Sequence, residues 1–305
     1  MSKKALIDRW AAGEGAATRR EISRRLADGT PLDDLDLPEF EGRADLRGLR
    51  IENAVLEGAG LVSADLSHAS LRGSRIVDAD FSRCRLDDSD LSDVTVQECS
   101  FSDCSIRRSD LRESLVADSS FDHVDFSAVK WGHFSAERSM FAECAFSDVV
   151  KADFTHCSFQ GGRFSGRLRE VRFVGRGMAE IGTPAVLRSV VFASGEFRYA
   201  EFDGMELQNV GFLESDRLIV IPEGFQAVAE RAGANSMIRG DQIGKDFRRF
   251  LSRESVQRPG LSATAGWVVG RQDLAADFPG GEELATFAVE TLYEAQRQLR
   301  EERLI

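Results

Sequence analysis

Residues 64–81 read ADLSHASLRGSRIVDADF, and an apolar residue recurs there at every fifth position, as Leu66, Leu71, Ile76 and Phe81. The same spacing continues without interruption from Leu46 to Trp131. A period of five fits neither an α-helix, whose period is near 3.6, nor a plain β-strand, whose period is 2. A short fixed repeat instead predicts a solenoid, in which each unit buries its apolar face against its neighbours.

A second inward position lies two residues before each central residue, and small or apolar residues such as Ala64, Ala69, Ser74 and Ala79 occupy it. A step of two residues places both side chains on one face of a short extended segment. The following step of three residues turns the chain. The pattern therefore predicts a coil of short edges and corners with a narrow core, and with mainly Asp, Ser, Arg, Glu and Gly outside.

Several repeats follow the motif A(D/N)Lxx, among them Ala44-Asp45-Leu46, Ala64-Asp65-Leu66, Ala79-Asp80-Phe81 and Ser109-Asp110-Leu111. On these residues the chain resembles the pentapeptide repeat family. The resemblance implies a mainly β fold, a right-handed quadrilateral β-helix with four repeats per turn. It covers residues 44–213.

The repeat loses phase near residues 147–153 and 165–168 and returns between Leu187 and Phe212. Bulges, missing corners and misassigned repeats all remain open as explanations. Residues 174–184 (VGRGMAEIGTP) contain three Gly and one Pro, which predicts a loop that projects from the coil.

The two ends of the chain lack the repeat. Residues 1–43 predict an N-terminal helical cap, with helices at 4–12 and 16–27, because an open solenoid end exposes its core. A partner-binding arm is the alternative. Residues 214–305 predict a mostly helical capping, dimerisation or partner-binding domain. In it we expect helices at 222–234, 239–252 and 282–303, and a short strand or buried loop at 267–269.

The positions of the cysteines and the lack of catalytic motifs both argue against a catalytic or metal-binding site. All five Cys occupy the small inward position, which predicts core filling rather than disulfides or metal binding. The sequence carries no HExxH, Walker A or GxSxG motif. We therefore expect a non-enzymatic protein without cofactor or metal. It has no apolar run long enough to span a membrane and no signal peptide, so we expect it in the cytoplasm.

The chain is acidic, with 51 Asp and Glu against 39 Lys and Arg and a net charge of −12, which disfavours direct binding of nucleic acid. Residues 76–126 hold 13 acidic residues against five Arg. If four repeats make a turn, residues twenty apart stack. The acids then form three ladders: Asp78, Glu98 and Asp118; Asp90 and Asp110; Asp93 and Glu113. Solubility alone is the alternative explanation of this charge.

The resemblance also implies a function, because some family members mimic duplex DNA and protect DNA gyrase from inhibitors. We therefore expect a protein that binds gyrase or topoisomerase IV through the three acidic ladders. We expect contributions from two further sets of residues, the loop residues Arg176, Met178, Glu180 and Ile181, and a helix face that meets a partner or a second copy, made of Leu284, Phe287, Leu292 and Leu299. One alternative is an interaction scaffold in which the β-helix is a spacer and the C-terminal domain binds the partner. An enzyme in the C-terminal region would lack a recognisable catalytic constellation.

Overall fold

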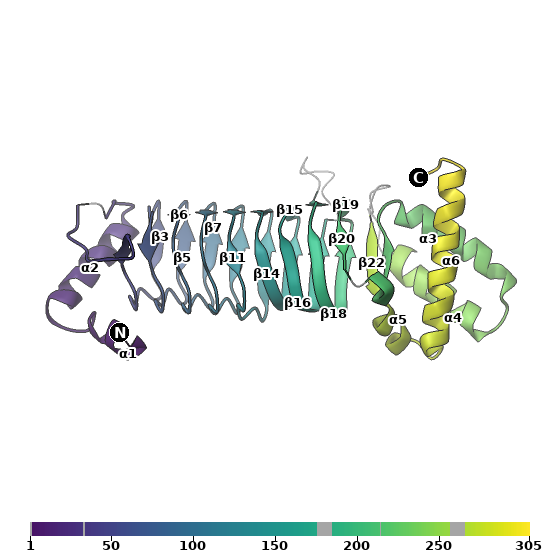
Figure 1. The fold of residues 1–305 in the computed structure, drawn as a ribbon, viewed down its shortest axis with the longest axis horizontal. Coiled ribbons are helices and arrows are strands. Elements are labelled where there is room, and N and C mark those ends of the chain that lie inside the picture. The colour runs from purple at the N-terminus through teal and green to yellow at the C-terminus, as the bar shows by residue number, and fades with distance from the viewer. Residues whose placement is uncertain (1, 33, 176–184, 214, 257–265) are drawn as a thin grey trace.

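The computed structural model of the chain describes residues 2–305 except residues 33, 176–184, 214 and 257–265. It forms a mainly β solenoid of about eight turns with helices at both ends (Figure 1). The fold expected from the five-residue repeat is therefore confirmed.

The turns of the coil stack in parallel with a register of twenty residues. In one sheet, Ile76 of β5 (Arg75–Val77) pairs with Val96 of β7 (Thr95–Gln97), which pairs with Val116 of β9 (Leu115–Ala117). The next face of the coil carries a second sheet that includes β6 (Asp80–Ser82), β8 (Ser100–Ser102) and β10 (Ser120–Asp122). Further strands of the coil are β3 (Val55–Glu57), β4 (Ala64–Asp65), β11 (Asp125–Phe126), β12 (Phe134–Glu137), β13 (Met140–Ala142), β15 (Ser158–Gln160), β17 (Val186–Arg188), β19 (Glu206–Gln208) and β20 (Gly211–Phe212).

Each corner of the regular coil is a residue with positive φ, the last residue of its repeat. Asp78, Asp93 and Glu98 have φ values of 53°, 58° and 56°. Only a few residue types reach this left-handed region easily, chiefly Gly, Asn, Asp and His. The corner conformation thus accounts for much of the Asp and Gly at these positions.

The core is a column of stacked side chains. Phe81, Phe101, Phe121 and Phe141 lie on successive turns, with ring centroids 4.7, 4.8 and 4.8 Å apart and planes nearly parallel. This distance equals the spacing of neighbouring strands, so identical positions fill identical space in each turn. All five Cys are buried and free, which confirms the prediction that they fill the core.

The two losses of phase are shortened turns with register shifts. Phe146 pairs with Phe164, eighteen residues later instead of twenty. In these turns the chain forms long strands across a position that is a corner in the earlier turns. The strands are β14 (Ala145–Thr155), β16 (Arg163–Val174) and β18 (Val191–Asp203). The register shifts between Ser147 and Val149, and again between Gly166 and Arg167. The aromatic column nevertheless continues, because Phe164 stacks on Phe146 with centroids 4.4 Å apart.

At the N-terminus, α1 (Lys3–Asp8) and α2 (Gly13–Ala27) lie against the first turn of the coil. Both helices were expected, but α1 ends earlier and α2 begins three residues sooner. Trp10, Ile22 and Leu26 join the core of the coil. An antiparallel pair that the sequence did not suggest follows, formed by β1 (Glu39–Phe40) and β2 (Arg43–Asp45).

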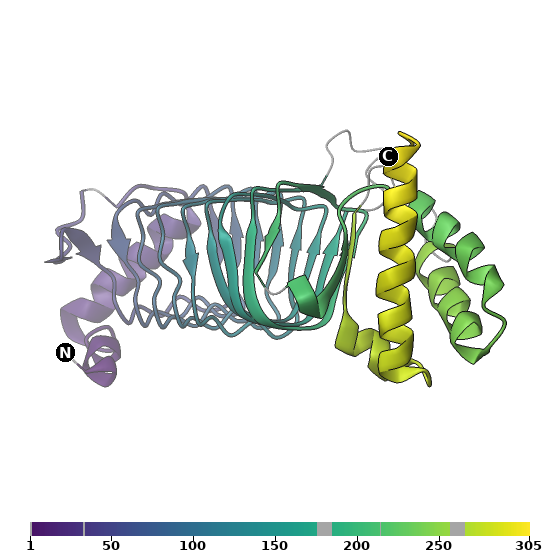
Figure 2. The ribbon, with the colours of Figure 1, turned by 45° about the vertical axis from the view of Figure 1, so that its right-hand side comes forward.

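At the other end, an antiparallel pair of strands separates the coil from the helices (Figures 1 and 2). Its strands are β21 (Leu218–Ile221) and β22 (Trp267–Gly270). Leu218 and Val268 pack into the core of the coil, whereas Ile219 and Trp267 pack into the core of the helical region. Successive side chains of a strand point to opposite sides, so this pair of strands closes the coil and anchors the helices.

The helical region agrees with the expected helices and adds one. The helices expected at 222–234, 239–252 and 282–303 are found with shifted ends, and a further helix, α5 (Arg271–Asp277), follows β22 directly. Among the described residues, no helix is both long and apolar enough to cross a membrane. The helices are α3 (Phe225–Asn235), α4 (Gln242–Leu251), α5 (Arg271–Asp277) and α6 (Gly281–Glu301), with short helical turns at Ser215–Arg217, Ser236–Ile238 and Ser252–Val256.

Candidate functional site

Five of the acidic residues expected to form ladders border a single sheet of the coil. Asp93 and Glu98 lie at the two ends of β7, Glu113 and Asp118 lie at the two ends of β9, and Asp78 follows β5. Because these strands stack in register, the carboxylates form two rows, one along each edge of the sheet. We call this surface, β5, β7 and β9 with the five acids, the acidic strip.

Backbone hydrogen bonds between turns hold the corners of the acidic strip in line. The amide of Asp78 donates to the carbonyl of Gln97 at 3.0 Å, and the amide of Glu98 donates to that of Ala117 at 3.1 Å. Neighbouring acids within a row are therefore about 4.8 Å apart along the coil, and the two rows are about 10 Å apart across a three-residue strand.

Most of the acidic strip lacks a compensating cation. Arg138 forms an ion pair with Asp118 at 2.7 Å, and its hydrogen bond lowers the pKa of that carboxyl. The other four carboxylates, those of Asp78, Asp93, Glu98 and Glu113, are exposed and have no Lys or Arg of the described residues within 4.0 Å. Like charges at this spacing repel one another, so the strip is a surface of concentrated negative potential.

The third expected ladder lies on the neighbouring face and is more nearly neutral. Asp90 and Asp110 are bridge partners across adjacent turns, as the twenty-residue stacking predicts. Arg112 lies 2.6 Å from Asp110, and Lys130 lies 3.6 Å from it. The hydrogen bond from Arg112 lowers the pKa of Asp110. This pair adds less net charge to the surface than the acidic strip does.

The other residues singled out from the sequence do not join the acidic strip. Leu284, Leu292 and Leu299 are buried in the core of the helical region, and Phe287 is half-buried with its ring against Phe247. The loop residues Arg176, Met178, Glu180 and Ile181 lie outside the described residues.

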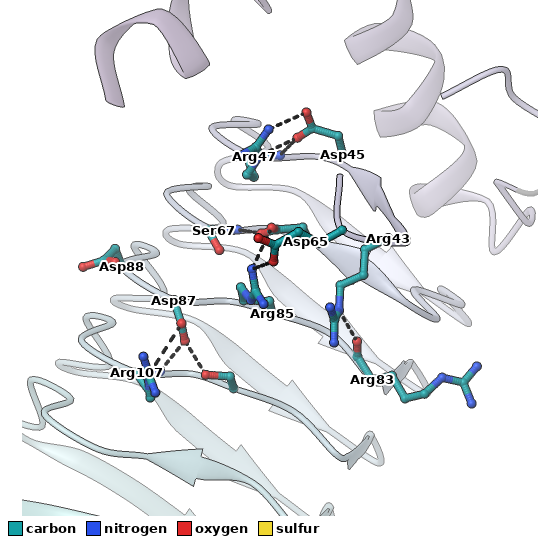
Figure 3. Close-up of polar contacts among 12 residues, drawn as sticks. Arg43, Asp45, Arg47, Asp65, Ser67, Arg83, Arg85, Asp87, Asp88 and Arg107 are labelled. Atoms are coloured by element: carbon teal, nitrogen blue, oxygen red, sulfur yellow. Dashed lines mark hydrogen bonds and ion pairs between the residues drawn. The ribbon is translucent and has the colours of Figure 1, made fainter. Parts of the chain in front are cut away.

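A groove of about 810 Å³ runs along the opposite face of the coil, and no sequence pattern predicted it. Its floor holds outward residues from successive turns, including Asp65, Arg85, Asp87 and Arg107 (Figure 3). Leu6, Phe40, Glu41 and Arg43 of the N-terminal cap close one end. The groove is lined by six Asp and Glu residues and five Arg from several turns of the coil, so neither a charge excess nor a local motif marks it in the sequence.

Ion pairs link the residues of the groove across turns and to the cap (Figure 3). Asp65 accepts a hydrogen bond from the amide of Ser67 at 2.9 Å. Arg85 donates to Glu41 at 2.8 Å and lies 3.6 Å from Asp65. The amide of Arg107 donates to Asp87 at 2.9 Å. Across the described part of the chain, no three His, Cys, Asp or Glu residues are grouped so as to hold a metal ion.

Comparisons with known proteins give one family match and solved structures of low similarity. The family model described as pentapeptide repeats matches eight copies, at residues 42–76 and 74–113. No curated protein matches the chain. Among solved structures, full-length QnrB1, a plasmid-mediated fluoroquinolone resistance protein, is 16% identical, with 55% of this chain and 92% of that chain covered and a TM-score of 0.32.

A second solved structure is HetL, a pentapeptide repeat protein involved in heterocyst differentiation regulation from the cyanobacterium Nostoc sp. strain PCC 7120. It is 18% identical, with 63% of this chain and 90% of that chain covered and a TM-score of 0.28. The eight matched repeats span residues 42–113, about a quarter of the chain, and within them the turns stack with the twenty-residue register, so this segment of the coil consists of pentapeptide repeats.

Proposed function

We propose that this protein is a non-enzymatic binder of a type II topoisomerase, DNA gyrase or topoisomerase IV, and that its acidic strip occupies the groove in which the enzyme holds DNA. The observation that supports this most is the set of four unpaired carboxylates in two rows, at Asp78, Asp93, Glu98 and Glu113. A basic groove that attracts phosphates attracts such a surface by the same long-range field.

The density of charge supports the proposal. Residues 76–126 carry a net charge of −8 and make two and a half turns. At one strand spacing per turn they occupy about 12 Å of the coil axis, or about one charge per 1.5 Å. Duplex DNA carries about one charge per 1.7 Å. This segment of the rod therefore matches DNA in the quantity that a basic groove senses first.

The left-handed conformation of the corners does not explain two of the four acids. Glu98 and Glu113 are corner residues with φ of 56° and 62°. Asp, Asn, His and Gly are favoured in this region, and Glu is not. Their presence is better explained by the charge that they place on the edges of the sheet. As in the inhibitor-protecting members of the family, we expect occupancy of the DNA groove to alter the response to topoisomerase inhibitors.

A supercoiling assay with purified gyrase, with and without a quinolone, tests the proposal. We expect the full chain at micromolar concentration to inhibit supercoiling or to relieve quinolone inhibition. A variant with four neutralised acids, Asp78→Asn, Asp93→Asn, Glu98→Gln and Glu113→Gln, should lose at least about tenfold in potency. This variant is called the strip variant below.

The matched control neutralises four acids outside the acidic strip: Asp80→Asn, Asp103→Asn, Asp122→Asn and Glu143→Gln. It carries the same change in net charge, so it should keep most of the wild-type potency. If the two variants behave alike, only the net charge matters and the proposal of a specific surface is wrong. If the wild type has no effect on gyrase or topoisomerase IV, topoisomerase binding itself is wrong.

One observation favours the alternative, a scaffold whose helical region binds the partner. Ile238 is 95% exposed and Met237 71% exposed. They lie beside an open groove of about 610 Å³ that Ile238, Arg239 and Phe287 help to line. Ile238→Ser should weaken a partner that docks here, with little effect of salt. A topoisomerase held by the acidic strip should instead be salt-sensitive and indifferent to Ile238→Ser.

A further inference from the structure

Three buried polar atoms on a single repeat have no hydrogen-bond partner, and all three residues line the groove opposite the acidic strip. The atoms are Oδ2 of Asp65, Oγ of Ser67 and Nδ1 of His68. Asp65 is 1% exposed and Ser67 is 8% exposed. A buried polar atom without a partner costs about 1–3 kcal/mol, so such atoms normally bond to protein, water or a ligand. Three on one wall indicate a surface that a bound molecule completes.

Arg85, the nearest cation, does not supply the missing hydrogen bond to Asp65. Arg85 Nη1 donates to Glu41 at 2.8 Å and lies 3.6 Å from Asp65 Oδ2, beyond hydrogen-bond distance. The guanidinium is therefore held mainly by the N-terminal cap. Asp65 Oδ2 keeps the capacity to accept a hydrogen bond from a donor that enters the groove.

A group of the opposite character lies two turns further along. The side chain of Arg107 is 47% exposed, and its guanidinium lies 3.8 Å from Asp87 and 4.0 Å from Asp125. These are ion-pair distances without hydrogen bonds, and its five N–H groups form none with side chains in the described part of the chain. Arg107 can therefore receive a carboxylate in a two-point contact.

We infer that the groove binds an extended polypeptide segment of mixed charge, with a basic side chain at Asp65 and Ser67 and an acidic side chain at Arg107. Five of the lining residues, taken in order along the coil, alternate in charge: Asp65, Arg85, Asp87, Arg107 and Asp125. Neither a polyanion such as nucleic acid nor a polycation complements that order.

The dimensions agree with a short peptide. From the turn of Asp65 to the turn of Asp125 the coil advances by three strand spacings, about 14 Å, which four or five extended residues span. Sites for small molecules are mostly apolar inside, whereas the groove presents charged and hydroxyl groups.

Repeats centred on Leu66 and Ile76 are half a turn apart, so the groove and the acidic strip lie on opposite faces and can be occupied at the same time.

Titration of the full chain with a mixed-charge hexapeptide, acetyl-Lys-Glu-Lys-Glu-Lys-Glu-amide, tests the inference by calorimetry and by NMR of the backbone amides. We expect saturable binding with shifts at Ser67, His68 and Arg107. Hexalysine and hexaglutamate should bind at least about tenfold more weakly. The double variant Ser67→Ala and Arg107→Gln should lose binding, and the matched double variant Arg75→Gln and Ser135→Ala, on the opposite face, should keep it.

Three results would overturn the inference: no binding at millimolar hexapeptide, equal binding of the like-charged peptides, or equal binding by the groove variant with an unchanged circular dichroism spectrum. The strip variant should bind the hexapeptide as the wild type does. Failure of the groove inference and failure of topoisomerase binding are therefore distinguishable.

Discussion

Arg9 clamps Asp45 with two hydrogen bonds, from Nη1 to Oδ2 at 2.7 Å and from Nη2 to Oδ1 at 2.7 Å. The same guanidinium donates to the carbonyl oxygens of Asp45 and Arg47, and the indole of Trp10 donates to the latter as well. Asp45 belongs to the first turn of the coil, and Arg9 follows α1 directly. This clamp fastens the N-terminal cap over the open end of the solenoid.

Removing the clamp should destabilise the first turns. Arg9→Ala leaves the buried carboxylate of Asp45 with Arg47 alone, and breaking a buried pair from one side costs several kcal/mol. Since Arg9 is partly exposed, we expect a loss of about 2–4 kcal/mol in the free energy of unfolding, measured with urea. Arg24→Ala, which removes exposed ion pairs within α2, should have a much smaller effect. Equal losses would mean that the clamp does not hold the cap.

The clamp should also make the cap sensitive to acid. Burial opposes the charged form of Asp45, but hydrogen bonds from Arg47 and Arg9 hold the pKa of this carboxyl well below its ordinary value of 3.8. A lowered pKa stabilises the fold above the unfolded-state value, and this contribution is lost as the pH falls towards the folded-state value. Wild-type stability should therefore drop below about pH 4. Asp45→Asn should be less stable at pH 7 and show a shallower loss in acid, as measured by urea unfolding across this range.

Asp273 should show the opposite dependence on pH at the other end of the coil. Burial raises the pKa of this carboxyl, although Oδ2 accepts a hydrogen bond from the amide of Tyr199 at 2.7 Å. A raised pKa means that its contribution to stability falls as the pH rises above 3.8. Asp273→Asn, which keeps an acceptor, should remove this fall. Asp273→Leu leaves the amide unpaired and should cost about 1–3 kcal/mol at neutral pH. Thermal unfolding of both variants measures the difference.

The aromatic column should be the most sensitive part of the core. Phe141 is buried between Phe121 and Phe159, with centroids 4.8 and 5.0 Å away. Phe141→Ala opens a cavity within a close-packed column, and we expect a loss of about 3–5 kcal/mol. Because each turn contacts only its neighbours, hydrogen exchange should quicken first in β10, β13 and β15. The adjacent, exposed Met140→Ala should change stability by less than about 0.5 kcal/mol.

The five-residue period was sufficient to predict the coil because a single burial pattern repeats in every turn. Leu66, Phe101 and Phe141 are all buried where the period places them. The shortened turns could be located but not interpreted. Whether the chain bulges between Ser147 and Val149 depends on its pairing with the next turn, and that pairing is not visible in local sequence.

The acidic strip was partly visible in the sequence, and the groove was not. Stacking by twenty aligned Glu98 with Asp118, but it did not reveal that Arg138 neutralises Asp118, because an ion pair depends on how a long side chain is oriented. The groove needs the cap as well as the coil. Glu41 meets Arg85 across forty-four residues, and no periodicity in the chain encodes that contact.

Competition between duplex DNA and this protein for gyrase tests the central claim most directly. The full chain, carrying a fluorescent label, would be bound to gyrase and followed by anisotropy as unlabelled duplex is added, at about 50 and 200 mM salt. We predict that duplex DNA displaces the protein from gyrase. The affinity of the protein for gyrase should fall at least about tenfold at the higher salt, and the strip variant should bind poorly at both salt concentrations. A complex that resists DNA, or a strip variant that binds as tightly as the wild type, would contradict the claim.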